Sequence, residues 1–265
     1  MAHLRAAARR SAITRMLEDK GAVSVNDLAA YFQVSPMTIR RDLAALSESG
    51  VAARGTGGAT LKREGLFELD ATQKMRVQAV QKRAIARVCA EQVEEGNSIF
   101  IDCGTTPAAI AHELAHRQDL TVFTNSLLVA SELSDAQHMQ LIMCPGEYRA
   151  RTMGFLGSTT IEFMKSFRID LAFMGAEGID IASGLSVPDS DDCVTKREIL
   201  NAARKVVFVL DSTKFGQEWL CQICTVDDVD SIVTDDGMSE EGLKPYREAG
   251  LEVIAASSND AELQP

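Results

Sequence analysis

Three segments of the sequence place small residues, hydroxyls and carboxylates where an apolar run ends. In the first, residues 99–107 (IFIDCGTTP), Gly104 would let a ligand approach the backbone closely, and Thr105 and Thr106 would offer hydroxyl donors. The helix expected after this turn begins with unpaired backbone N–H groups at the positive end of its dipole, which favours an anion. A plain strand-to-helix turn capped by Thr106 is the alternative.

Two later segments repeat this arrangement. Residues 122–126 (VFTNS) lead from an apolar run into a helix, and residues 173–180 (FMGAEGID) end an apolar run in glycines and two carboxylates. Ligands of open α/β sheets bind beyond the carboxyl ends of the strands, so the three segments predict one anion site. Lys196 and Lys214 would add positive charge to it, although a single lysine is more often a solvated surface group.

A different chemistry is expected at residues 34–43 (VSPMTIRRDL). A Ser-Pro start suits the first turn of a helix, in which Ile39 and Leu43 would face inward. With a preceding helix capped by Ser24 and a short turn, this pattern predicts a helix-turn-helix whose second helix reads base edges. A solvated arginine pair is the alternative. The residues expected at the DNA are Ser35, Met37, Thr38, Arg40 and Arg41.

The distribution of charge supports a DNA-binding segment at the N-terminal end and a separate function for the remainder of the chain. The 265-residue chain has a net charge of −11, yet residues 1–63 hold 10 Lys and Arg against 5 Asp and Glu. Residues 64–265 hold 17 against 33. A basic N-terminal part joined to an acidic remainder indicates that only the first meets a polyanion.

Composition excludes several other classes of protein. No apolar run approaches the length needed to span a bilayer and no secretory signal is evident, so a cytoplasmic protein without membrane contact is expected. The six cysteines are too sparse for a disulfide scaffold. Cys221 and Cys224 form one CxxC without a second pair, for which two ordinary thiols are favoured over a zinc or redox site. Neither a metal nor a cofactor is expected.

These sites need elements to position them. After short N-terminal helices and a turn or β-hairpin wing expected at residues 54–59, residues 64–70 indicate a linker and residues 71–95 indicate one long helix. Strands are then expected at 98–102, 120–124, 140–144, 170–174, 205–211, 231–234 and 251–255. Helices are expected at 107–116, 126–133, 159–166, 192–203 and 239–249. This alternation predicts an α/β fold with a mostly parallel sheet covered on both faces.

The motifs resemble those of the DeoR family of bacterial repressors. Residues 34–43 with Leu46, Gly50 and Arg54 are similar to its helix-turn-helix signature, which continues into Gly57-Gly58-Ala59. The remainder is similar to its sensor domain, through D-x-G-T-T at 102–106, T-N-S at 124–126, G-A-E-G-I-D at 175–180 and D-S-T-K-F-G at 211–216. The chain departs from the family at Thr56, at Cys144-Pro145-Gly146 and at Glu177.

The resemblance implies a winged helix-turn-helix and an α/β sensor domain resembling sugar-phosphate isomerases. The domains would be a DNA-binding domain at 1–63, a linker and connecting helix at 64–95, and the sensor at 96–265. Arg54 joins the DNA-binding residues. The effector-binding residues expected from motifs and resemblance are Asp102, Gly104, Thr105, Thr106, Thr124, Asn125, Ser126, Gly146, Glu177, Gly178, Asp180, Lys196 and Lys214.

The function implied is transcriptional regulation, typically repression of a carbohydrate-catabolic operon. A homodimer or homotetramer would bind double-stranded operator DNA, and a phosphorylated sugar or related metabolite would change that affinity. One alternative is an isomerase or deaminase of sugar phosphates, in which Asp102, Glu177 or Asp180 would act as a base. Another is a scaffold protein with an inactive pocket, whose DNA affinity would not respond to any metabolite.

Overall fold

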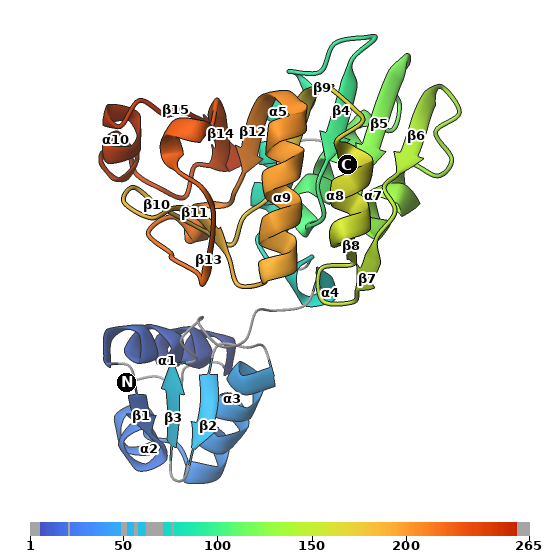
Figure 1. Cartoon of the computed structure of the whole chain (residues 1–265). Coiled ribbons are helices and arrows are strands. Elements are labelled where there is room, and N and C mark those ends of the chain that lie inside the picture. Colours follow the sequence, from blue (N-terminus) through green and yellow to red (C-terminus); the bar gives the residue numbers. More distant parts are fainter. Residues whose placement is uncertain are drawn as a thin grey trace. The chain divides into compact units, whose positions relative to one another are not determined.

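The computed structural model describes residues 6–20, 22–48, 52–55, 58–61, 71–75 and 77–258 (Figure 1). The chain divides into two compact units, Met1–Glu68 and Leu69–Pro265. Within the described ranges, none of the helices combines the length and the apolar character that a bilayer crossing requires.

The first unit has the predicted winged helix-turn-helix architecture. Its elements are α1 (Ala6–Lys20), β1 (Ala22–Ser24), α2 (Val25–Phe32), α3 (Pro36–Glu48), β2 (Ala52–Gly55) and β3 (Gly58–Leu61). The strands form an antiparallel sheet in the order β1-β3-β2. The three helices bury Ile13, Leu17, Leu28, Ile39 and Leu43 in one core. The tip of the β2–β3 hairpin, which includes Thr56, lies outside the described residues.

Local sequence signals determine where these helices begin and end. The Ser24 hydroxyl accepts a hydrogen bond from the Asn26 N–H at 3.2 Å, which caps α2 as predicted. Gln33 ends that helix in the left-handed conformation, with φ of 53°. The Ser35 hydroxyl then accepts the Thr38 N–H at 3.2 Å, and Pro36 occupies the first position of α3.

The second unit is built on a seven-stranded parallel sheet in the order β15-β14-β12-β9-β4-β5-β6 (Figure 1). Its strands are β4 (Ser98–Ile101), β5 (Leu120–Thr124), β6 (Met139–Met143), β9 (Ile169–Met174), β12 (Ala203–Val209), β14 (Ser231–Asp235) and β15 (Glu252–Ala256). All seven were predicted from the sequence. On the interior strand β4, Phe100 enters one core cluster whereas Ile99 and Ile101 enter the other, which explains its continuous apolar run.

Helices cover both faces of this sheet. The cluster that contains Ile99 also takes in Ile85, Ile110 and Val129 from α5 (Ala79–Ala90), α6 (Thr105–Leu114) and α7 (Leu127–Glu132). The opposite cluster takes in Met164, Ile199 and Leu243 from α8 (Ser158–Met164), α9 (Ser190–Ala202) and α10 (Glu240–Glu248). The predicted fold class, an α/β domain with both faces covered, is therefore confirmed.

The prediction of a single long helix over residues 71–95 is wrong. The chain forms α4 (Ala71–Lys74) and then α5, and Gln78 between them has a left-handed φ of 55°. The Lys82 ammonium donates to the carbonyl oxygens of Lys74 and Val77, at 2.6 and 2.7 Å, and so stabilises this break. Apolar spacing could not reveal it, because the stabilising contacts come from a buried lysine.

Several short strands were not anticipated. β7 (Glu147–Arg149) pairs with β8 (Gly154–Leu156) as a hairpin, and β10 (Gly178–Asp180), β11 (Gly184–Val187) and β13 (Cys221–Cys224) form an antiparallel sheet. Two 3-10 turns, Ser212–Lys214 (η1) and Val226–Asp228 (η2), join later elements. The CxxC cysteines lie at the two ends of β13 as free thiols. Among the residues with described positions, no three His, Cys, Asp or Glu side chains are arranged to hold a metal ion.

Candidate functional site

Helix α3 presents polar and charged side chains on one face. Ile39 and Leu43 are buried in the core, whereas Met37 is 58% exposed and Arg40 and Arg41 are also exposed. At the start of the helix, the hydroxyls of Ser35 and Thr38 lie 2.9 Å apart. This is the arrangement of a recognition helix, in which N-terminal side chains contact base edges and flanking cations contact phosphates.

A buried ion pair joins α3 to α1. Arg9 Nε lies 2.6 Å from Asp42 Oδ2, and both side chains are buried. Asp42 directly follows the two exposed arginines, so this pair helps to fix which face of α3 they occupy. Arg54 belongs to β2, and its side chain lies outside the described residues.

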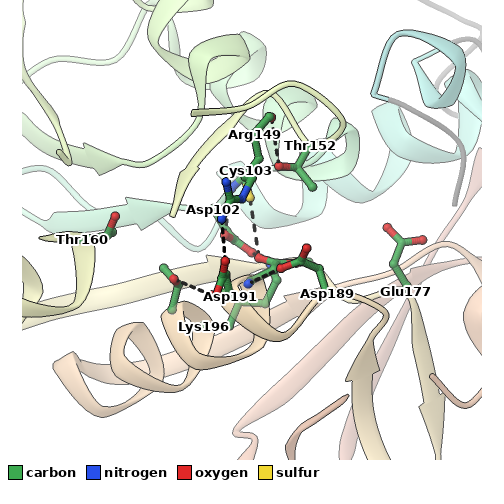
Figure 2. Close-up of polar contacts among 12 residues, drawn as sticks. Asp102, Cys103, Arg149, Thr152, Thr160, Glu177, Asp189, Asp191 and Lys196 are labelled. Carbon is green, nitrogen blue, oxygen red and sulfur yellow. Dashed lines mark hydrogen bonds and ion pairs between the residues drawn. The ribbon is translucent and has the colours of Figure 1, made fainter. Parts of the chain in front are cut away.

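In the second unit, Asp102 follows β4 and is completely buried. Its carboxylate accepts the N–H groups of Cys103, at 2.8 Å, and Gly175, at 3.1 Å, and it forms an ion pair with Lys196 of α9. Lys196 also lies 3.4 Å from Asp192 Oδ1. Burial alone would lower the pKa of Lys196, but the carboxylates of Asp102 and Asp192 outweigh it and raise that pKa well above its usual value. Figure 2 shows Asp102 and Lys196 among the polar contacts around α9.

The turn after Asp102 has the features of an anion site. Gly104 has a φ of 136°, which favours glycine, and no side chain caps the helix that begins at Thr105. Thr105 and Thr106 are about nine-tenths buried. The β7–β8 hairpin lies against this turn, since a Cβ at Gly154 would come within 2.8 Å of the Cys103 Cβ. Uncapped N–H groups therefore coincide with two hydroxyls in a sheltered position.

The three polar residues at the end of β5 and directly after it have different roles. Thr124 Oγ1 donates to the Ile101 carbonyl at 2.6 Å and accepts the Ser126 N–H at 3.0 Å. Ser126 Oγ caps α7 by accepting the Val129 N–H at 3.4 Å. Asn125 is fully buried, and neither its amide oxygen nor its amide nitrogen has a hydrogen-bond partner among the described residues. Since such groups are rarely left unsatisfied, the Asn125 amide is the best placed of the three for a ligand.

Glu177 lies between two lysines from distant parts of the chain. Its carboxylate forms ion pairs with Lys74 of α4 and with Lys214 of η1, the latter at 2.9 Å. Burial would raise the pKa of Glu177, but the two ammonium groups lower it to about 2. For Lys82, burial lowers the pKa to about 8, and Lys214 and Lys74 act in the same direction. Lys74 and Lys214 thus flank the ionised Glu177 carboxylate, and the Lys82 ammonium lies close enough to bond to the Lys74 carbonyl oxygen.

Three of the predicted ligand residues have packing roles in this structure. Asp180 Oδ1 accepts the N–H groups of Ala182 and Ser183, at 2.8 and 3.2 Å, and so holds the turn between β10 and β11. A side chain at Gly178 would clash with the Gln217 carbonyl, and one at Gly146 with the Thr160 hydroxyl. The backbone in both places is closely packed by protein atoms, which accounts for glycine without a ligand.

Four residues were missed by the sequence analysis. Asp192 lies four positions before Lys196 on α9, a spacing that could have been read as an ion pair. Arg149 of β7 lies 2.5 Å from Asp191 Oδ2 and lies above Asp102 in Figure 2. Lys74 and Lys82 fall in the range predicted as one long helix, and the apolar pattern of that range gave no sign of their contacts with Glu177 and with the backbone.

Sequence comparison decides the family. Residues 9–64 match the DeoR-like helix-turn-helix domain, and residues 77–236 match the DeoR C terminal sensor domain. The chain belongs to the DeoR family. This regulator is 37% identical over 227 residues to the Glycerol-3-phosphate regulon repressor of Escherichia coli (strain K12), covering 86% of the chain and 90% of that protein. It is 32% identical to the Putative aga operon transcriptional repressor of Escherichia coli O157:H7, covering 93% and 92%.

These relatives are transcriptional repressors rather than enzymes, so the interpretation as a DNA-binding regulator is confirmed over that as an isomerase. A ribose 5-phosphate isomerase from Methanocaldococcus jannaschii superimposes on 52% of the regulator and 55% of its own chain, with a TM-score of 0.40 and 16% identity. A structural similarity at this TM-score carries no information about catalytic activity. The family models and the sequence relatives decide the family.

Proposed function

We propose that this DeoR-family regulator represses a carbohydrate-catabolic operon and that a phosphorylated sugar or related metabolite changes its affinity for double-stranded operator DNA. One relative is named as repressor of a glycerol-3-phosphate regulon, which supports a small organic phosphate as effector. The observation that carries the proposal is the uncapped start of α6 behind Gly104, accompanied by the buried, unpartnered amide of Asn125. We expect the regulator to act in the cytoplasm.

Each polar group near the β4 and β5 ends has a proposed role. The phosphoryl group would accept the N–H groups and hydroxyls of Thr105 and Thr106, because both lie at the positive end of α6. The Asn125 amide would bind a second polar group of the effector, and Glu177 would accept its hydroxyls. Lys214 would add positive charge. Asp102, Lys196, Thr124 and Ser126 would position the turns, since their polar atoms already bond within the protein.

The first unit, Met1–Glu68, would bind the operator DNA. Arg40 and Arg41 are exposed on α3 and would contact guanine edges or phosphates, with Ser35, Met37 and Thr38 near the groove and Arg54 on the wing. A homodimer or homotetramer would place recognition helices on spaced half-sites.

A fluorescence anisotropy titration tests the proposal. Labelled DNA from upstream of the regulated gene is titrated with the full chain, alone and with glycerol 3-phosphate, ribose 5-phosphate, glucosamine 6-phosphate or the same compounds without phosphate. One phosphorylated compound should change the operator Kd by about 5-fold to 150-fold, and its unphosphorylated counterpart should not. Absence of DNA binding at every salt concentration would overturn the proposal. Specific binding that ignores all these compounds would favour the scaffold alternative.

A further inference from the structure

The first described element of the second unit, α4, is bonded to the β7–β8 hairpin. The Ala71 N–H donates to the Arg151 carbonyl at 2.8 Å. Arg151 lies in the β7–β8 hairpin, whose Gly154 packs on Cys103 beside the Gly104 turn. The start of α4 is thus bonded to the same hairpin that lies against the proposed anion site.

The end of α4 is anchored on the other side of that site. Lys74 forms an ion pair with Glu177, which follows β9 and is 103 positions away in the sequence. Both side chains are 18% exposed, so the pair is largely shielded from water. Shielding of this degree strengthens an ion pair beyond the small contribution of a surface pair.

A third contact connects α4 to the core. Lys82 of α5 donates its ammonium to the carbonyl oxygens of Lys74 and Val77. Its neighbours Ile85 and Ala86 on the same helix are fully buried in the sheet core. The described residues 71–75, 77 and 78 are therefore held between α5 and two segments that border the proposed effector site.

We propose that the Lys74–Glu177 ion pair couples effector binding to the segment that leads to the DNA-binding unit. This inference rests on the proposed function. A phosphorylated effector carries the same sign of charge as Glu177, so the two compete for the Lys74 ammonium. Binding of the effector therefore breaks the bond between Lys74 and Glu177 and loosens α4, and the operator affinity changes because the chain leading to the DNA-binding unit is less constrained.

Hydrogen exchange of the full chain tests the coupling without an effector. In Lys74→Gln and in Glu177→Gln, the amides of segment 71–78 should exchange at least about 5-fold faster than in the wild type, with β4 and β9 unchanged. In anisotropy titrations, both variants should shift the operator Kd in the same direction, although they change the net charge in opposite directions. The double variant should shift it no further than either single variant.

The exposed Lys165–Glu162 pair on α8 provides matched controls. Lys165→Gln and Glu162→Gln make the same charge changes and should leave segment 71–78 and the operator Kd as in the wild type. Addition of glycerol 3-phosphate to the wild type should speed exchange of the same segment. Opposite Kd shifts, or exchange of 71–78 at the wild-type rate in both single variants, would overturn the coupling.

The two proposals can fail separately. If the variants behave as expected but no phosphorylated compound alters DNA binding, the link from the Lys74–Glu177 pair to operator affinity stands, and both the proposed effector class and the competition for Lys74 are wrong. If glycerol 3-phosphate or another sugar phosphate alters DNA binding in Lys74→Gln by the same factor as in the wild type, the effector class stands and the coupling is wrong.

Discussion

Lys196 on α9 and Asp102 at the end of β4 form a buried ion pair across 94 positions of sequence, with side chains 3% and 0% exposed. The Asp102 carboxylate also accepts the Gly175 N–H, so one side chain connects β4, α9 and the residue after β9. Its oxygens are occupied by protein donors. Asp102 therefore fixes the shape of the turn at Gly104 rather than offering a free carboxylate to a ligand.

Lys196→Met should strongly destabilise the second unit, because it leaves the Asp102 carboxylate buried without its cation. The expected loss is about 3–5 kcal/mol in the free energy of unfolding, measured by urea denaturation. Adding Asp102→Asn should recover part of this loss, since no uncompensated charge then remains. A double variant that is less stable than Lys196→Met would contradict this role for the pair.

Asn125→Leu should have opposite effects on the stability of the regulator and on its response to the effector. The Asn125 amide has no partner among the described residues, so an apolar side chain of similar shape removes a desolvation cost of about 1–3 kcal/mol. We expect a higher Tm together with loss of the effector-induced change in operator Kd. A lower Tm with an unchanged response would show that the amide serves the folded protein instead.

Arg40→Ala and Arg41→Ala should each weaken operator binding without changing effector affinity. Both residues are exposed on α3, and the core residues Ile39 and Leu43 are untouched, so the fold and Tm should not change. A lost bidentate base contact would cost about 1–3 kcal/mol and relax sequence preference. A lost phosphate contact would instead reduce the salt dependence of the Kd. Unchanged operator binding in both variants would refute the assignment of α3.

The double variant Thr105→Val, Thr106→Val should retain DNA binding and lose the response to phosphorylated compounds. Valine preserves the shape of both side chains but removes two hydroxyl donors from the uncapped start of α6. The check is anisotropy with and without the active compound identified for the wild type. An intact response would place the anion elsewhere in the unit.

Glu177→Gln should show a stability difference that depends on pH. Lys74 and Lys214 lower the pKa of Glu177 to about 2, below its unfolded value of 4.5. The stabilisation is therefore complete above about pH 4.5 and is lost as the pH falls towards 2. Urea denaturation at pH 7 should find the variant less stable than the wild type, with a gap that narrows over this interval. A gap that is constant with pH would mean that the charge of Glu177 is not responsible.

Much of the scaffold could be predicted from local patterns. The seven strands of the parallel sheet follow from short apolar runs, because interior strands such as β4 and β9 bury residues on both faces of the sheet. The caps at Ser24 and Ser35 follow from side chains that reach only two or three residues along the chain. The anion site at residues 104–106 remains a prediction from sequence, and the uncapped helix there is consistent with it.

The sequence by itself thus determined the family, the strands of the parallel sheet and the turns at which polar groups gather. Only the tertiary structure decided which of those polar groups already have hydrogen-bond partners within the protein. The side chains of Thr124, Ser126 and Asp180 form hydrogen bonds within the protein, whereas the Asn125 amide has no partner among the described residues. The structure also brought Lys74 to Glu177. Such ion pairs join residues about a hundred positions apart. Burial strengthens the attraction between the two charges because it removes the water that would otherwise weaken it.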